Sequence, residues 1–251
     1  MRTFNSILKN SPSNLGALRS SLLRALRSED YYGKSVYEES GRLNCKQLAN
    51  LKLGRQDVFF KTDRRDEENS AVSLMIDLSG SMSDVRRNLL ADKKDIRPIE
   101  VATETTVQLA NIINKTSSTL SISGFNAFRK FSVFQFKNWA ESLNARTKHN
   151  IANMKACVGW STPVVQAYQW QLEDLNKVNA FKKIAVFITD DSIYSNEKKA
   201  MDHFSKMADQ MGINVVIISI EADLRIKNSI RINNVADMGG VVMSNILKKI
   251  K

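Results

Sequence analysis

Three oxygen-bearing side chains follow one apolar run of this sequence at alternate positions. The run is Ala71–Ile76, and Asp77, Ser79 and Ser81 come directly after it. An apolar run that stops at small polar residues is typical of a buried parallel strand. Oxygen ligands with few charges suit a hard, octahedral cation such as Mg²⁺, which leaves room for an outside ligand. These residues predict a site for Mg²⁺ or another divalent cation, although such residues in a turn also often bond only their own backbone.

Two further candidate ligands follow other apolar segments. Thr162 lies in a glycine-containing loop before a predicted helix, and Asp190 ends the apolar run Ile184–Thr189. In an open α/β sheet the carboxyl ends of parallel strands meet at one edge, so these residues can join the first three. Alternatives stay open for both: Thr162, followed by Pro163, is also a routine helix N-cap, and Asp190 can cap a helix or face solvent. Ser161 is a second candidate hydroxyl in the same loop.

The elements that position these residues follow from hydrophobic periodicity. A helix over 98–114 is predicted to bury Ile99, Ala102, Thr106, Leu109 and Ile113, and one over 196–211 to bury Ala200, Phe204 and Met207. Other helices are expected at 14–26, 164–175 and 244–251, and strands at 58–60, 71–76, 120–125, 131–136, 182–189, 213–220 and 235–243.

Alternation of these strands and helices predicts the fold class. We expect an α/β domain over 71–251, with a doubly wound, mostly parallel sheet flanked by helices. Residues 1–70 form an N-terminal helical and extended extension in this interpretation, with a loop-rich stretch over 28–40 and an amphipathic segment from Gly41. Five phenylalanines lie in or beside the strands at 120–136, and we interpret them as core and sheet residues rather than as a stacking surface for bases.

Composition limits the classes of function. Of 251 residues, 43% are hydrophobic and 25% charged, which excludes global disorder. No apolar run approaches the length of a membrane span, and a secretory signal pattern is absent from the first residues. Cys45 and Cys157 form neither a metal-ligand spacing nor a disulfide framework, so we expect cytoplasmic residence. The net charge of +11 is spread along the chain and favours acidic partners, whether protein or nucleic acid.

The pattern Asp-x-Ser-Gly-Ser after a strand resembles the metal-ion-dependent adhesion site (MIDAS) of von Willebrand factor A domains. The resemblance implies that Ser79, Ser81 and Thr162 ligate the ion directly and that Asp77 and Asp190 act directly or through water. An acidic side chain of a partner protein would then complete the octahedron. The family usually has glycine after the second aspartate, whereas this chain has Asp191, which adds negative charge near the ion.

A narrower resemblance covers residues from about 15 onward. The chain is similar to the CobT subunit of aerobic cobaltochelatase at Gly41-Arg42-Leu43, at Val58-Phe59, at the metal-site motif with Met82 after it, and at Trp170. Because it is compact and basic, it also resembles the CobT-like proteins of large tailed phages. For a phage-encoded protein, the expected location is the host cytoplasm. The long acidic region of full-length CobT is missing, which puts cobalt insertion in doubt.

Three functions follow from these resemblances and from the charge. The first is a non-catalytic adaptor that works with an AAA+ ATPase of the MoxR or CobS type, because the chain has no Gly-x-x-x-x-Gly-Lys-[Ser/Thr] motif of its own. The second is a subunit of a cobalt or magnesium chelatase in tetrapyrrole biosynthesis. The third, which we do not favour, is nucleic-acid binding. His149 and His203 are interpreted as ordinary surface residues, so no catalytic residue is predicted.

Overall fold

The structure is a computed structural model that describes residues 3–9, 31–38, 42–43, 59–65, 70–85, 97–116, 118–190, 194–220, 222, 224, 226 and 229–232. The chain divides into two compact units, one made of residues 1–27 and 69–251 and the other of residues 28–68. The expected helices at 14–26 and 244–251 and the expected strand at 235–243 lie outside the described residues.

The smaller unit contains a three-stranded antiparallel sheet in the order β1-β3-β2. Strand β1 (Tyr31–Glu38) pairs with β3 (Phe59–Arg65), and the two-residue strand β2 (Arg42–Leu43) pairs with the other edge of β3. The expectation of a loop-rich stretch over 28–40 is therefore wrong for residues 31–38. Three tyrosines and a valine in this segment favour extended backbone, and pairing with β3 satisfies the polar groups that a loop would leave to solvent.

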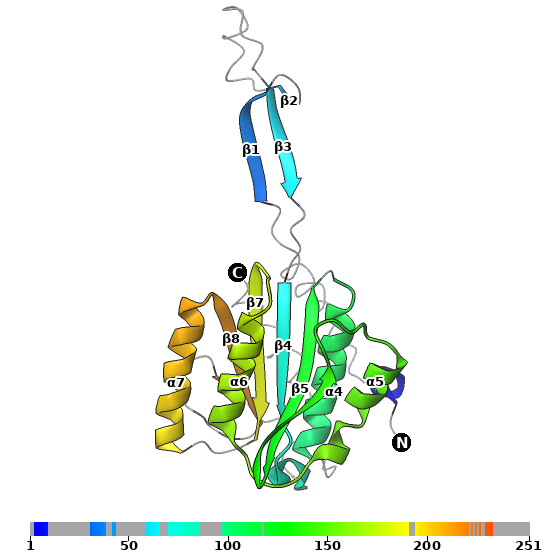
Figure 1. Ribbon diagram of the computed structural model, residues 1–251. Helices are drawn as coiled ribbons and strands as arrows, with labels where there is room; N and C mark the ends of the chain where they lie inside the picture. The colour runs from blue at the N-terminus through cyan, green and yellow to red at the C-terminus, as the bar shows by residue number, and fades with distance from the viewer. Residues whose placement is uncertain are drawn as a thin grey trace, which may run out of the picture. The chain divides into compact units, whose positions relative to one another are not determined.

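The larger unit is built on a six-stranded sheet in the order β6-β5-β4-β7-β8-β9 (Figure 1). Its strands are β4 (Ser70–Asp77), β5 (Thr119–Phe128), β6 (Lys130–Lys137), β7 (Lys182–Thr189), β8 (Ile213–Ile220) and β9 (Ser229–Ile232). Only the β5–β6 pair among them is antiparallel. The predicted doubly wound, mostly parallel sheet is confirmed, and β4 lies inside it between β5 and β7.

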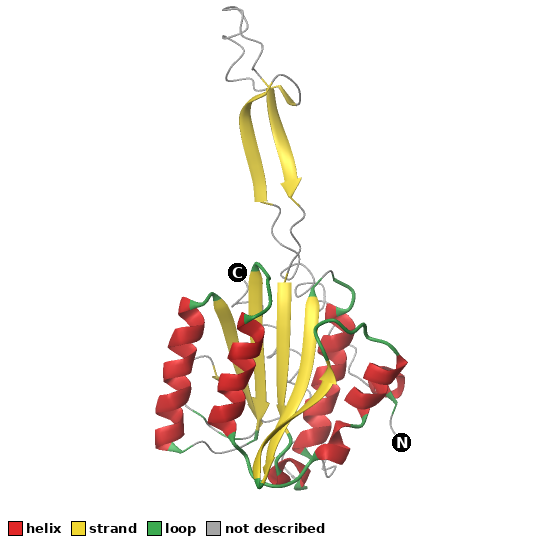
Figure 2. Cartoon of the chain, viewed as in Figure 1, coloured by secondary structure: helices red, strands yellow, loops and turns green. Residues whose placement is uncertain are grey.

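Helices cover both faces of this sheet (Figure 2). One core contains residues of α1 (Phe4–Lys9), α4 (Pro98–Ile113) and α5 (Ala145–Ala152), and the other contains residues of α6 (Val164–Asn176) and α7 (Ser195–Gln210). Short 3-10 helices η3 (Gly80–Ser83) and η4 (Met154–Cys157) lie in the connections. Because Phe4 and Ile7 of α1 belong to the first core, the first residues pack with the larger unit, although the sequence grouped them with the 1–70 extension.

Strand β4 is the most completely covered part of this sheet. All eight of its residues are buried. Its side chains alternate between the two cores, with Val72, Leu74 and Ile76 in one and Ala71 and Met75 in the other. Burial on both faces explains why the strand appears in the sequence as a continuous apolar run rather than as an alternating pattern.

The predicted helix faces are confirmed for α4 and differ by one residue for α7. The five residues expected to be buried in α4 are all buried. In α7 the fully buried positions are Met201, Ser205 and Ala208, whereas Ala200, Phe204 and Met207 are half-buried. The two stripes are adjacent on the helix. The periodicity did not identify the buried stripe because it contains the polar residue Ser205, whose hydroxyl forms a hydrogen bond with Tyr168 inside the protein.

The phenylalanines of the β5–β6 hairpin divide between core and surface. Phe125 and Phe136 are buried, and Phe131 and Phe134 pack against the two cores, as expected. Phe128 is exposed at the tip of the hairpin, so the expectation of a core role is wrong for this residue. None of the helices among the described residues is long and apolar enough to cross a membrane.

Candidate metal centre

Asp77 and Ser79 begin a tight loop at the carboxyl end of β4. The buried carboxylate of Asp77 accepts a hydrogen bond from the backbone N–H of Ser79, at 2.8 Å from Oδ1. Helix η3 then begins at Gly80 and carries Ser81. This turn closes on an aspartate side chain, as short polar residues commonly do, and it fixes the carboxylate relative to the two serines.

Asp190 joins this loop from the neighbouring strand. The Ser79 and Ser81 hydroxyl oxygens lie 3.0 Å apart, and the Ser81 hydroxyl donates to Asp190 Oδ1 at 2.9 Å. The parallel register pairs Ile76 with Ile188, so the residues that follow β4 and β7 come out at the same edge of the sheet. The structure thus brings together four of the five predicted ligands, Asp77, Ser79, Ser81 and Asp190.

Thr189 is a member of this network that the sequence reasoning missed. Its hydroxyl donates a 2.6 Å hydrogen bond to Asp77 Oδ2, on the carboxylate oxygen that Ser79 N–H leaves free. Both residues are fully buried. A hydroxyl residue that ends a buried apolar strand immediately before Asp190 was the signal that could have identified it.

Burial dominates the electrostatics of the centre. It raises the pKa of Asp77 from 3.8 to about 7, against the hydrogen bonds from Thr189 and Ser79, which lower it, and with a further increase from the charge of Asp190. A carboxylate taken out of water is destabilised in its charged form unless an opposite charge compensates it. Ionisation of Asp77 in the folded protein is therefore unfavourable without a cation, and a bound cation would stabilise its charged form.

Thr162 lies in a loop that contacts the Asp77 loop through backbone atoms. Gly159 N–H donates to Leu78 O at 2.8 Å, and Gly80 N–H donates to Trp160 O at 3.0 Å. Helix α6 begins at Val164 with Pro163 at the N-cap and no capping hydrogen bond from a side chain, so the reading of Thr162 as a helix cap is wrong. Hydrogen bonds that involve the side chains of Asp77, Ser81 and Asp190 and both the backbone and the hydroxyl of Ser79 join those four residues, whereas backbone bonds of Gly159 and Trp160 connect the loop of Thr162 to them.

The remaining candidates lie apart from this network. The Ser161 carbonyl accepts a hydrogen bond from Ala127 N–H, and the side chain of Ser161 is exposed. His149 and His203 are exposed on α5 and α7, as expected of ordinary helix residues. Asp191 is outside the described residues.

The donor set itself defines which ion would fit. Within the described residues no cluster of three His, Cys, Asp or Glu side chains occurs, so a soft or imidazole-rich metal site is not formed there. The network offers two carboxylates and two serine hydroxyls, all oxygen donors. Such a set fits a hard divalent cation, and Asp77, Ser79, Ser81 and Asp190 are the residues that would hold it.

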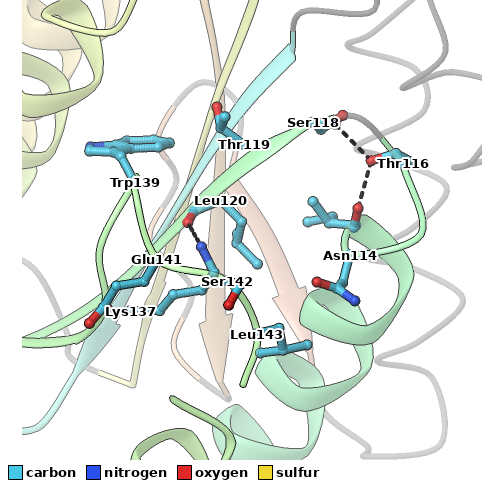
Figure 3. Close-up of a pocket in the computed structure, with 11 residues that line it drawn as sticks. Asn114, Thr116, Ser118, Thr119, Leu120, Lys137, Trp139, Glu141, Ser142 and Leu143 are labelled. Atoms are coloured by element: carbon cyan, nitrogen blue, oxygen red, sulfur yellow. Dashed lines mark hydrogen bonds between the residues drawn. The ribbon is translucent and has the colours of Figure 1, made fainter. Parts of the chain in front are cut away.

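A cavity near the amino end of β5 lies apart from the candidate metal centre. It measures about 140 Å³ and is lined by residues from the end of α4, the start of β5 and the segment after β6 (Figure 3). The buried Lys137 donates from Nζ to Leu120 O at 2.6 Å and to Asn138 O at 3.1 Å. Burial lowers the pKa of Lys137, and Glu141 partly opposes this. Two backbone carbonyls already accept hydrogen bonds from the Lys137 ammonium group. We therefore interpret this lysine, and the cavity that it lines, as part of the structure of the β5–β6 hairpin rather than as a binding site.

Comparison with known proteins gives structural matches only. No protein-family model and no curated protein matches the sequence. The PilB minor pilin from Streptococcus sanguinis matches with a TM-score of 0.55 and 14% identity, covering 76% of this chain and 63% of the pilin. The von Willebrand factor domain of the pilus tip protein Mfa5 from Porphyromonas gingivalis matches with a TM-score of 0.53 and 9% identity, covering 72% of this chain and 94% of that domain.

A third match contains a metal. Proximal thread matrix protein 1 from the mussel byssus, in a structure with a zinc-occupied MIDAS motif, matches with a TM-score of 0.52 and 12% identity, covering 72% of this chain and 45% of that protein. At these identities the matches show the fold alone. The chain has a von Willebrand factor A-like α/β fold, and the narrower resemblance to CobT stays a prediction.

Proposed function

We propose that this chain is a protein-binding adaptor that depends on a divalent cation, Mg²⁺ in the cell, held by Asp77, Ser79, Ser81, Thr162 and Asp190. The single observation that carries the proposal is the chain of hydrogen bonds across the ends of β4 and β7. Asp77 accepts from the backbone N–H of Ser79, the Ser79 hydroxyl lies 3.0 Å from that of Ser81, and Ser81 donates to Asp190. A carboxylate side chain of a partner would occupy an open position on the ion. That contact is charge-assisted and is lost when the ion is removed.

The partner in this proposal is an AAA+ ATPase of the MoxR or CobS type, as the resemblance to CobT-like proteins implies. The adaptor itself has no phosphate-binding motif, so the energy for remodelling a client protein must come from that ATPase. We expect both proteins in the cytoplasm. Membership of a cobalt or magnesium chelatase would use the same centre, but no residue of the described chain suggests a tetrapyrrole site.

The test is affinity capture from the native lysate on the immobilised full chain, in Mg²⁺ and in EDTA. The same capture is done with Asp77→Ala and Ser81→Ala, and with Asp84→Ala as the matched control. Asp84 is exposed, and its backbone N–H donates to Ser81 O, a bond that the change to Ala keeps, while its side chain is not part of the chain of hydrogen bonds from Asp77 to Asp190. Circular dichroism checks that each variant is folded.

The expected result is an AAA+ ATPase that is captured only in Mg²⁺, by the unmodified chain and by Asp84→Ala. An unchanged set of captured proteins in EDTA and with both network variants would contradict the proposal. Nucleic-acid binding through the net charge of +11 predicts a different pattern: capture that falls steeply with salt and is indifferent to EDTA.

A further inference from the structure

Exposed apolar side chains gather on the segments around the candidate metal centre. In the part of the chain that the structure describes, six large apolar or aromatic side chains are strongly exposed. Four of them, Val85, Phe128, Trp160 and Tyr194, lie on segments that leave the carboxyl edge of the sheet, where α7 also begins (Figure 1). The other two, Phe181 and Met211, precede β7 and β8 and so lie at the opposite edge.

Phe128 and Trp160 form a pair within this group. Their ring centroids are 4.2 Å apart with an interplanar angle of 43°, yet Phe128 remains 47% exposed and Trp160 64% exposed. The guanidinium carbon of Arg129 lies 5.5 Å from the centre of the Phe128 ring. Two contacting aromatic rings that keep so much surface in water are typical of a protein-binding surface rather than of a core.

The backbone holds two of these residues in an uncommon conformation. Arg129 has φ 60° and Trp160 has φ 71°, both in the left-handed region that bulky side chains rarely adopt. Left-handed backbone in non-glycine residues persists when the surrounding structure enforces it, and it concentrates at functional positions. The ring of Trp160 is mostly exposed to solvent, so packing in the core does not explain the left-handed backbone of this residue.

Hydrogen bonds tie this pair to the candidate metal centre. Trp160 O accepts from Gly80 N–H at 3.0 Å, between Ser79 and Ser81 in sequence. The hairpin that carries Phe128 is in turn joined to the loop of Trp160, through the bond from Ala127 N–H to Ser161 O at 3.0 Å. Backbone hydrogen bonds therefore hold the segments that carry Phe128 and Trp160 beside the loop of Ser79 and Ser81.

We propose that Phe128, Arg129 and Trp160 form a specificity surface beside the ion. The partner segment it fits is a protein loop in which the carboxylate that reaches the cation is next to a large aromatic or aliphatic side chain. The ring pair would receive that apolar side chain, while exposed Arg129 and Lys130 complement the negative charge of the loop. This inference rests on the proposed function, because the carboxylate binds at the cation.

The experiment is a selection from a random twelve-residue peptide library displayed on phage, against the immobilised full chain in Mn²⁺, with elution by EDTA. We expect the selected peptides to carry Asp or Glu beside an aromatic or large aliphatic residue. One such peptide is then synthesised, together with a version that has Ala in place of its apolar residue, and the affinity of each is measured in Mn²⁺.

The double variant Phe128→Thr/Trp160→Asn completes the cycle, since Asn tolerates the left-handed backbone of position 160. It should bind the selected peptide about ten-fold more weakly, and should not distinguish it from the Ala version. Its affinity for Mn²⁺ should stay within about two-fold of the unmodified chain. Phe181→Thr, which removes a 76% exposed ring at the opposite edge, is the matched control and should change neither affinity.

The outcomes separate the two proposals. Acidic peptides selected without a preference for an apolar neighbour, or no peptide selected although Mn²⁺ binds, would overturn the specificity surface and leave the metal centre standing. A chain that does not bind Mn²⁺ would overturn the proposed function itself, and the inference with it.

Discussion

The hydroxyl of Thr189, the last residue of β7, donates a 2.6 Å hydrogen bond to Asp77 Oδ2 at the end of β4. The backbone N–H of Ser79 occupies Oδ1 of the same carboxylate. Asp77 is thus held on both oxygens by neighbouring elements before any cation is considered. A ligand whose orientation is set in this way loses little freedom when it binds an ion, and residues that orient a ligand contribute measurably to metal affinity.

Thr189→Val should therefore weaken Mn²⁺ binding by about 10- to 100-fold, because it removes the hydroxyl but keeps the shape of the side chain. Thr189→Ser is the matched control, since it keeps the donor and should bind nearly as well as the unmodified chain. Isothermal titration with Mn²⁺ measures both. Equal affinities for the two variants would show that the bond to Asp77 does not position it for an ion.

The raised pKa of Asp77 predicts how stability depends on pH in the absence of a cation. Between pH 3.8 and about 7 the folded protein keeps a proton on Asp77 that the unfolded chain has lost. Stability should therefore fall as pH rises through this range, by on the order of 4 kcal/mol for this group. Urea unfolding in EDTA at several pH values measures it.

Asp77→Asn is the control for that dependence, because it has the same shape and no charge to lose. Its unfolding free energy should lack the Asp77 contribution to the fall with pH. Addition of Mn²⁺ to the unmodified chain at pH 8 should restore stability, since the ion compensates the buried charge, and Mn²⁺ affinity should drop below pH 7, where the proton competes. Parallel pH curves for Asp77→Asn and the unmodified chain would contradict the assignment.

Gly124 of β5 leaves room for the side chain of Leu78, which lies between Asp77 and Ser79 in the candidate metal centre. A Cβ at position 124 would lie 2.4 Å from Leu78 Cδ1 and 2.8 Å from Leu78 Cγ. Gly124→Ala should destabilise the protein by about 1–3 kcal/mol, as overpacking of a core does. Combined with Leu78→Ala, which alone opens a cavity, the loss in unfolding free energy should be clearly less than the sum of the single losses. Strict additivity in urea unfolding would argue against this contact.

The α6–α7 contact includes a hydrogen bond between two buried hydroxyls as well as shared apolar packing. Tyr168 Oη and Ser205 Oγ lie 2.8 Å apart, and burial raises the pKa of Tyr168 to about 12. Tyr168→Phe or Ser205→Ala alone leaves one hydroxyl unpaired and should lower the unfolding free energy by about 1–3 kcal/mol. The double variant leaves no orphaned group, so it should be more stable than the two single losses predict. Thermal unfolding of all four proteins provides the comparison.

The sequence alone determined the main sheet and most of the candidate site. Buried strands appear as continuous apolar runs because both faces are covered, and each run stops where polar residues begin. That local rule located Asp77, Ser79 and Ser81 after β4 and Asp190 after β7. The helical spacing of Ile99 to Ile113 likewise predicted the buried face of α4, since every position in that stripe is filled by an apolar residue or a threonine.

The tertiary structure decided how residues that are distant in sequence contact one another. The bond from Thr189 to Asp77, the burial that raises the Asp77 pKa, and the pairing of Phe128 with Trp160 all depend on strand register and loop placement. Likewise, α7 buries the stripe with Ser205 because Tyr168 on another helix satisfies its hydroxyl. A local pattern records which residues prefer burial, whereas these contacts depend on which segments the fold brings together, and only the folded chain specifies that.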